Sequence, residues 1–163
     1  MSETPAPEVQ APVFSIEKIY AKDLSLEIPH APQVFLERDA PEIEIQLHSE
    51  GGNIDEGLYQ VVLTVTVTAK IGDKTLFLVE AGQAGIFQLR NIPQGDIEPI
   101  LAVACPNILF PYARETISDL VTRAGFPPVL LSPVNFDALY QQRQVAQQAQ
   151  QPQTHPSDNI PIQ

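Results

Sequence analysis

The chain has 163 residues, which is about the length of one domain, and 44% of them are apolar. Twenty acidic against nine basic side chains give a formal net charge of −11. This charge repels phosphate backbones and anionic lipid headgroups, so we expect no nucleic-acid binding and no membrane insertion, and it favours a basic partner. A single cysteine excludes an intramolecular disulfide and a cysteine-rich zinc site, and it suits a reducing compartment.

The two ends differ in composition from the middle of the chain. Met1–Pro12 is acidic and proline-spaced, without a basic residue or an apolar run, so we expect a disordered tail and not a secretory or transit peptide. Gln141–Gln153 is mostly glutamine and further prolines follow, which predicts a flexible tail over residues 142–163. One folded domain is therefore expected over residues 13–141. We expect the protein to be soluble and intracellular.

The first strand-like segment, Phe14–Ile28, alternates between apolar and polar residues. Successive side chains of a strand point to opposite faces, so its even-numbered and odd-numbered residues form two faces. The odd face is mainly polar and includes Asp23, Ser25 and Glu27. The even face is mainly apolar and consists of Phe14, Ile16, Lys18, Tyr20, Lys22, Leu24, Leu26 and Ile28.

Three further strands are predicted before residue 90. Prolines in Pro29–Pro41 indicate a long irregular crossover, which leads into alternating residues over 42–48. Leu58–Ile71 is rich in β-branched residues, and Gly72-Asp73 is typical of a hairpin turn before the fourth segment, Thr75–Leu89. Short links between successive strands favour an antiparallel meander.

After Pro93 the apolar residues follow helical spacing. One run, Ile100–Ile108, is interrupted at Pro106, and a second ends at Gly125, which is typical of a helix C-terminus. A short helix is predicted to begin near Asn135. Strands followed by helices predict an α+β fold built on a four-stranded antiparallel sheet.

The sequence lacks a recognisable catalytic constellation. His30, His48 and His155 are far apart and do not have metal-ligand spacing, so we expect no metal site. Cys105 precedes a proline in an apolar run, as expected of a buried, inert thiol. Gly72–Thr75 lacks the paired glycines of a phosphate-binding loop. We therefore expect neither an enzyme nor a cofactor, and activity that runs on binding energy alone.

Apolar residues exceed what one small sheet and a helix pair can readily cover. Val34, Phe35 and Leu36 lie between prolines of the crossover, and Phe126–Tyr140 adds a largely apolar stretch with little regular structure. The surplus is either ordinary monomer core, or it is buried between subunits or lines a groove for apolar ligands.

Several uncommon blocks occur in order and with the spacing of one known family. They are Ile19–Glu27 (IYAKDLSLE), Val62–Ala69 (VLTVTVTA), Phe77–Phe87 (FLVEAGQAGIF), Cys105–Glu115 (CPNILFPYARE), Gly125–Pro128 (GFPP) and Pro133–Tyr140 (PVNFDALY). Together they resemble the SecB family of bacterial protein-export chaperones over the region from Phe14 to Tyr140.

The resemblance implies a four-stranded antiparallel sheet with helices on one side, assembled as a homotetramer that is a dimer of dimers. It implies an ATP-independent cytoplasmic chaperone that binds unfolded precursors of exported proteins, keeps them competent for translocation and delivers them to SecA, the motor of the Sec translocase. Burial of the precursors' exposed apolar segments would supply the binding energy.

The resemblance also implies a SecA-binding surface made of Asp23, Glu27, Leu78 and Glu80. The alternation of the first strand independently puts Asp23 and Glu27 on one face, and that of the fourth puts Leu78 beside Glu80. An acidic sheet face would attract a basic partner and speed its encounter. A plain solvated strand face is the alternative interpretation of the same pattern.

For unfolded substrates, the family has a groove between the crossover and the last helix. The residues assigned to it here are Phe35, Phe136, Leu139 and Tyr140, and core packing is the alternative for all four. Two other functions remain open. One is a SecB-like chaperone or structural homo-oligomer that acts without SecA, for example for a toxin–antitoxin pair, and the other is an enzyme or small-ligand carrier that uses the same groove.

Overall fold

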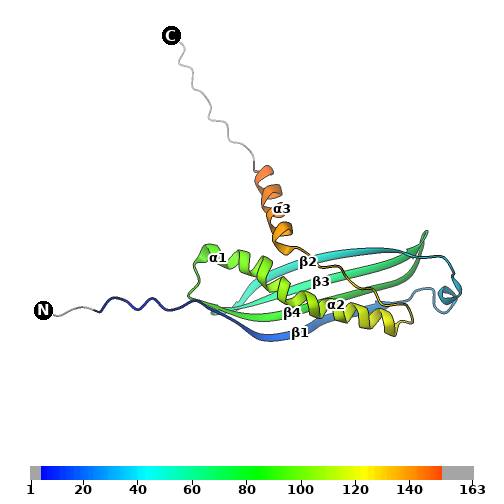
Figure 1. Cartoon of the computed structure of the whole chain (residues 1–163), viewed down its shortest axis with the longest axis horizontal. Helices are drawn as coiled ribbons and strands as arrows, with labels where there is room; N and C mark the ends of the chain where they lie inside the picture. Colours follow the sequence, from blue (N-terminus) through cyan, green and yellow to red (C-terminus); the bar gives the residue numbers. More distant parts are fainter. Residues whose placement is uncertain (1–4, 152–163) are drawn as a thin grey trace, which may run out of the picture.

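The computed structural model describes residues 5–151, in which four strands are followed by helices (Figure 1). Its elements are β1 (Val13–Glu27), the 3-10 turn η1 (Gln33–Leu36), β2 (Glu42–Asp55), β3 (Leu58–Ile71), β4 (Lys74–Arg90), α1 (Gln94–Pro99), the π-helical turn η2 (Ile100–Ala104), α2 (Cys105–Arg123) and α3 (Phe136–Ala149). This confirms the expected α+β class. His155 and the outer parts of both expected tails lie outside the described residues.

The four strands form one antiparallel sheet in the order β1-β4-β3-β2. β2, β3 and β4 form the predicted meander, and Gly72 takes a positive φ of 58° in the turn between β3 and β4, a conformation that glycine adopts readily. β1 departs from the meander because it pairs with β4 and not with β2. In this order β1 and β2 are the two edge strands, and the long crossover carries the chain from one edge of the sheet to the other.

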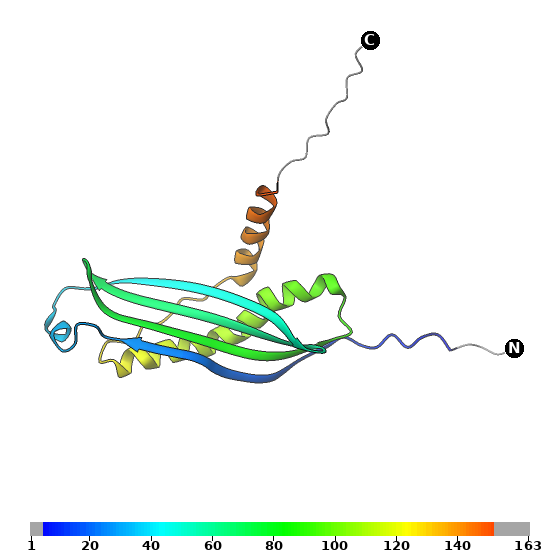
Figure 2. The same ribbon diagram turned by 180° about the vertical axis from the view of Figure 1, so that it is seen from behind.

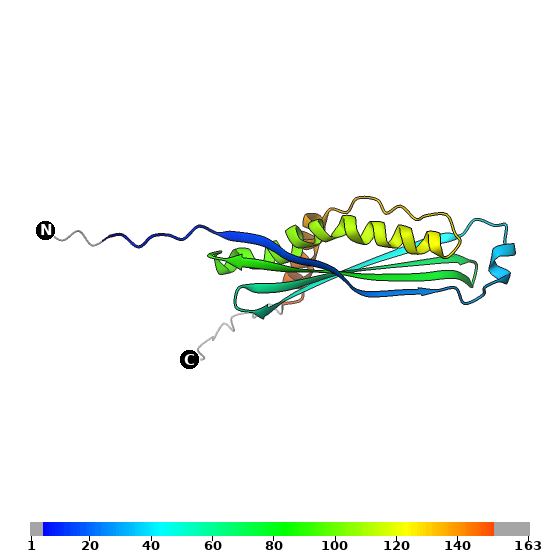
Figure 3. The same ribbon diagram turned by 90° about the horizontal axis from the view of Figure 1, so that it is seen from below.

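Helix α2 lies along one face of the sheet, over its two central strands (Figure 3). We call this the helix face and the opposite side, which Figure 2 views, the open face. Odd-numbered residues of β3 and β4, such as Val65 and Phe87, are fully buried on the helix face, where they belong to one core with Leu109 and Ile117 of α2. The helical stripe and the strand alternation seen in the sequence thus meet in one hydrophobic core.

Strand β1 does not keep the strict alternation that its sequence predicts. Register shifts occur between Ile16 and Lys18 and between Ala21 and Asp23, and each extra residue reverses which face the next side chain takes. Tyr20 therefore lies opposite Ala84 on the open face, where its hydroxyl donates a hydrogen bond to the side-chain oxygen of Gln60. The expected apolar even face holds at the two ends of β1 but is wrong for Lys18 and Tyr20.

The helical region contains the interruption predicted at Pro106. Proline has no backbone N–H to donate, and its ring crowds the carbonyl group four residues earlier. The chain widens into the π-helical turn just before it, and the N–H of Cys105 bonds to the carbonyl oxygen of Ile100. The α-helical pattern then resumes in α2 and ends at Arg123, two residues before Gly125, whose φ is 89°.

Helix α3 continues past residue 141, where the domain was expected to end. Glutamine is a good helix former, so a glutamine-rich run does not by itself end a helix. The side chain of Asn135 caps the start by accepting the N–H of Ala138, and the amide of Gln144 donates to Glu98 of α1. The helix therefore extends to Ala149.

Gly85 allows close packing between the sheet and α2. A Cβ atom at this position would lie 2.7 Å from Cε2 of Phe87 and 3.1 Å from Cδ2 of Leu109. We expect Gly85→Ala to destabilise the fold by about 1–3 kcal/mol, because an overpacked core must shift. The measurement is the urea unfolding midpoint at a fixed protein concentration. Gly95→Ala is the control, since nothing lies within 4 Å of its added Cβ; an equal loss in both variants would contradict this packing role.

Candidate functional site

The four residues expected to bind SecA lie on the open face, and we call them the acidic patch. Glu27 of β1 lies directly opposite Leu78 of β4, and Ser25 lies directly opposite Glu80. Asp23, opposite Gly82, belongs to the next pair on the same face. The strand register thus brings Asp23 and Glu27 beside Leu78 and Glu80 on one surface.

The carboxylates of the acidic patch are available for an external partner. The described part of the chain contains three ion pairs, and none of them involves Asp23, Glu27 or Glu80. Glu80 lies on a central strand and is half-buried, with its Oε1 accepting a hydrogen bond of 3.4 Å from the hydroxyl of Thr66. Asp23 and Glu27 are exposed on the edge strand. The patch therefore combines two exposed charges, one partly shielded charge and an apolar side chain.

A cavity of about 460 Å³ is lined by the second half of the crossover, and we call it the crossover pocket. Its walls are formed by residues 34–43 of the crossover and the start of β2, by Leu76 and Phe77 of β4, and by residues 125–129 after α2. Most of these side chains are apolar, while Glu37 and Asp39 add two carboxylates. The pocket therefore suits an apolar side chain with a polar or cationic neighbour.

Three aromatic rings line the crossover pocket. The ring of Phe126 stacks on that of Phe35 with centroids 5.2 Å apart and tilts against Phe77 at 4.9 Å. Gly125 permits this arrangement, because a Cβ there would lie 3.2 Å from Cε1 of Phe35. The Nζ of Lys74 lies 2.9 Å from Oε1 of Glu37, which ties the β3–β4 turn to the crossover.

The other three residues of the expected groove lie elsewhere. Phe136, Leu139 and Tyr140 line a small cavity of about 40 Å³ between the middle of β2 and α3. Phe136 is buried and its ring is T-shaped to that of Phe110 at a centroid distance of 6.0 Å, so it belongs to the core. Leu139 remains 42% exposed.

The structure therefore does not bring Phe35 together with the last helix in one cavity. The helix-face residues of β2 connect the two cavities. Ile43, at the crossover pocket, and Ile45, next along this face, are 43% and 44% exposed. Sequence reasoning did not assign Phe77 or Phe126 to the groove. The sequence feature that could have indicated Phe126 is the GFPP block, which holds this aromatic residue between a glycine with a positive φ and two prolines.

A second strip of apolar residues is uncovered along β1. Phe14, Ile16 and Leu24 lie on the helix face beyond the reach of α2 and are 42–48% exposed. The outer edge of β1 has no neighbouring strand within the described sheet, so its backbone groups are available for pairing. Together they make β1 suitable for contact with another polypeptide.

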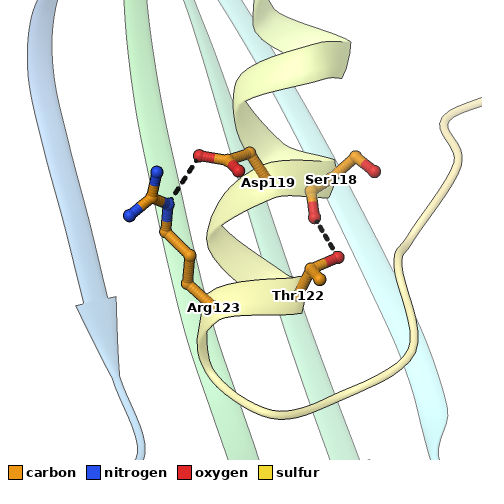
Figure 4. A network of polar contacts seen from close by, with 4 residues as sticks. All are labelled: Ser118, Asp119, Thr122 and Arg123. Atoms are coloured by element: carbon orange, nitrogen blue, oxygen red, sulfur yellow. Dashed lines mark hydrogen bonds and ion pairs between the residues drawn. The ribbon is translucent and has the colours of Figure 1, made fainter.

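The outer surface of α2 is polar by contrast. In its last turns the Nε of Arg123 lies 2.8 Å from Oδ2 of Asp119, and the hydroxyl of Thr122 donates to the carbonyl oxygen of Ser118 (Figure 4). A shallow hollow of about 470 Å³ lies beside these residues. Polar side chains of α2 line this hollow together with Pro111 and the exposed Leu130, so it offers both hydrogen-bonding and apolar contacts.

The described residues contain no group of three or more histidine, cysteine, aspartate or glutamate side chains that could hold a metal ion. Burial raises the pKa of the Cys105 thiol to about 12, which keeps it protonated and unreactive near neutral pH. His48 is exposed, with its Nε2 3.5 Å from Oε2 of Glu50. No helix between residues 5 and 151 combines the length and the apolar character needed to cross a membrane.

Comparison with known proteins relates the chain to one family. The family model described as "Preprotein translocase subunit SecB" matches residues 7–148. The "Protein-export protein SecB" of Methylobacillus flagellatus is 64% identical over 154 residues, which cover 94% of this chain and 98% of the relative. That of Chromobacterium violaceum is 68% identical over 139 residues, covering 85% of this chain and 92% of the relative.

A solved structure shares the fold. The SecB-like chaperone of Mycobacterium tuberculosis, in complex with a ChAD peptide from the HigA1 antitoxin, superposes with a TM-score of 0.61 at 15% identity and covers 74% of this chain and 90% of its own. This likeness supports the fold, whereas the sequence identities above establish the family. The chain therefore belongs to the SecB family of protein-export chaperones.

Proposed function

We propose that this export chaperone works in the cytoplasm, where it binds unfolded precursors at its apolar surfaces and hands them to SecA at its acidic patch. The observation that carries this proposal is the separation of the two kinds of surface. The acidic patch lies on the open face, whereas the crossover pocket and the exposed β2 residues belong to the helix face. A precursor and SecA could therefore be held at the same time.

Precursor binding is supported by the run of apolar surface from the crossover pocket along β2. Burial of apolar area contributes about 25 cal/mol per Å², so a long extended segment can gain affinity from many modest contacts. Separate contacts on one chaperone add avidity without demanding a single sequence. Loose apolar contacts of this kind suit promiscuous recognition, and release requires a competitor or a handover, not nucleotide hydrolysis.

SecA binding at the acidic patch is supported by charge and by register. Asp23, Glu27 and Glu80 offer carboxylates without an ion-pair partner in the described chain, and Leu78 offers an apolar contact among them. A basic element of SecA would be steered to this surface over a distance. The chain's net charge of −11 strengthens that attraction.

Assembly into a homotetramer is supported by the uncovered surfaces. β1 offers an apolar strip and an open edge, and α2 offers a polar outer surface. Pairing through β1 would make a dimer, and contact between outer helix surfaces would join two dimers. A closed assembly of this kind uses the same patches on every copy.

The first test concerns the acidic patch. We expect the triple variant Asp23→Lys, Glu27→Lys, Glu80→Lys to lower SecA affinity by a factor of about a hundred or more, because several steering and contacting charges are reversed together. The measurement is titration calorimetry at two salt concentrations. The matched control reverses three exposed acids away from the patch, Glu8, Glu56 and Asp73, which lie in the tail and in turns.

Tetramer mass and precursor affinity should be unchanged in the patch variant. SecA affinity that is equal in the patch and control triples would contradict the proposed surface. No binding of SecA by the unaltered protein would favour a chaperone that works without SecA.

The second test concerns the precursor path. Ile43 lines the crossover pocket and is already 43% exposed, so Ile43→Asp should fold normally while placing a charge where an apolar segment would lie. We expect precursor affinity to fall by about tenfold, since part of one apolar side-chain contact is lost and a carboxylate is desolvated. Binding is measured with a fluorescently labelled, reduced and unfolded precursor.

Ile54→Asp is the control for the precursor path, because Ile54 lies near the other end of the same strand and is 51% exposed. Equal affinities of the two variants would exclude the crossover pocket as a precursor site.

The third test concerns assembly. Light scattering should give a mass of about 72 kDa, four times the 17.9 kDa of one chain. Leu24→Lys, on the exposed apolar strip of β1, should lower that mass because a lysine cannot be buried unpaired. A stable monomer for the unaltered chain would contradict the proposed assembly.

A further inference from the structure

The open face continues beyond the acidic patch into a hollow that no residue between 5 and 151 fills. The hollow has a volume of about 230 Å³ and is lined by Glu50, Gly51, Gly52, Gln60 and Val62. In the sheet register, Glu50 and Val62 are in line with Ala84 and Tyr20, which form the next pair on the open face after Asp23 and Gly82. The next pair along is Gly52 and Gln60. The hollow and the acidic patch are therefore neighbours on one continuous surface.

The described part of the chain shows no structural requirement for glycine at position 52. A Cβ atom at this position would meet nothing within 4 Å, and its backbone does not take the positive φ that favours glycine. The neighbouring Gly51 differs, because its Cβ would lie 3.2 Å from Cγ2 of Val61. Glycine inside a strand lowers stability by about 0.5–1 kcal/mol relative to alanine, and it often marks a place where a ligand approaches the backbone closely. The missing side chain at Gly52 therefore points to an occupant other than residues 5–151.

The walls of the hollow define what it could accept. Val62 is only 7% exposed and forms an apolar floor. The side-chain oxygen of Gln60 accepts hydrogen bonds from the hydroxyl of Tyr20 and, at 3.4 Å, from the Nζ of Lys22, so this wall is held from the β1 side. On the β2 side, the largely exposed carboxylate of Glu50 provides the negative charge. The apolar floor and the carboxylate of Glu50 suit the stem and head of a lysine or arginine side chain on the β2 side of the hollow, away from the ammonium of Lys22 on the β1 side.

We propose that the hollow receives a basic side chain of the same SecA element that binds the acidic patch, so that the docking surface reaches from Glu27 to Gly52. This inference rests on the proposed SecA binding and adds a second contact to it. The choice of occupant follows from continuity with the patch and from charge complementarity with Glu50. Gly52 leaves the space, Val62 contacts the stem and Glu50 pairs with the charge.

Two variants test the hollow with the full-length protein and SecA. Gly52→Val fills the space with a residue that strands favour, and Glu50→Gln removes the charge while keeping the shape. We expect each to weaken SecA binding by about fivefold, which is the scale of one partly exposed contact. The double variant should lose little more than Gly52→Val alone, because both changes act on one occupant.

The matched controls are Gly95→Val and Glu56→Gln, which make the same changes at exposed positions outside the hollow. Both should leave SecA affinity unaltered. The urea unfolding midpoint of Gly52→Val should equal or exceed that of the unaltered protein, which separates loss of binding from loss of folding.

The outcomes distinguish this inference from the function on which it rests. If the acidic-patch triple loses SecA binding while Gly52→Val and Glu50→Gln keep full affinity, the hollow has no role and the patch stands. If the unaltered protein does not bind SecA, both are overturned. A change in the mass of Gly52→Val would instead make the hollow a contact between copies of this chain, and a drop in precursor affinity alone would make it a precursor site. Either result overturns the proposal.

Discussion

The packing of α2 across β3 and β4 is the constraint on which the rest of the molecule depends. It buries the odd-numbered residues of the two central strands, and Gly85 lets the helix approach closely enough for Phe87 and Leu109 to meet. One helix is too narrow to cover four strands. The apolar residues of β1 and β2 on the same face therefore stay partly exposed, as at Leu24 and Ile43. The surfaces available for partners are thus a direct consequence of how much the core can cover.

Residue periodicity was sufficient to predict much of this arrangement. A period of two placed Leu78 beside Glu80 and Asp23 beside Glu27, and the register across β1 and β4 brings these pairs together. Periodicity could not reveal the bulges in β1, because a single extra residue leaves composition unchanged while it reverses the face of Tyr20. It also could not separate Phe35 from Phe136, since both are aromatic residues in proline-rich surroundings. Only the path of the backbone decides which of them lines the crossover pocket.

The end of the folded region shows a different limit of composition. A glutamine-rich run suggested a loose tail, yet glutamine favours a helix once a capped start such as Asn135 is present. At Pro106 the sequence correctly predicted an interruption of the helix, because a proline has no backbone N–H to donate whatever residues surround it. Sequence interpretation was therefore most secure where a residue imposes a backbone constraint and least secure where it only permits one.

The two faces of the sheet also bear on how a chaperone without a nucleotide cycle could release its load. The two proposed surfaces lie on opposite faces of one sheet, so a partner on the open face would not displace a precursor on the helix face by direct contact. Coupling would have to pass through the strands themselves or through the edges, where β1 and β2 belong to both surfaces. Glu50 shares strand β2 with the exposed Ile43 and Ile45, and Asp23 and Leu24 are neighbours on β1. The edge strands are where binding on one face could be coupled to binding on the other, because a shift of either strand would move residues of both faces together.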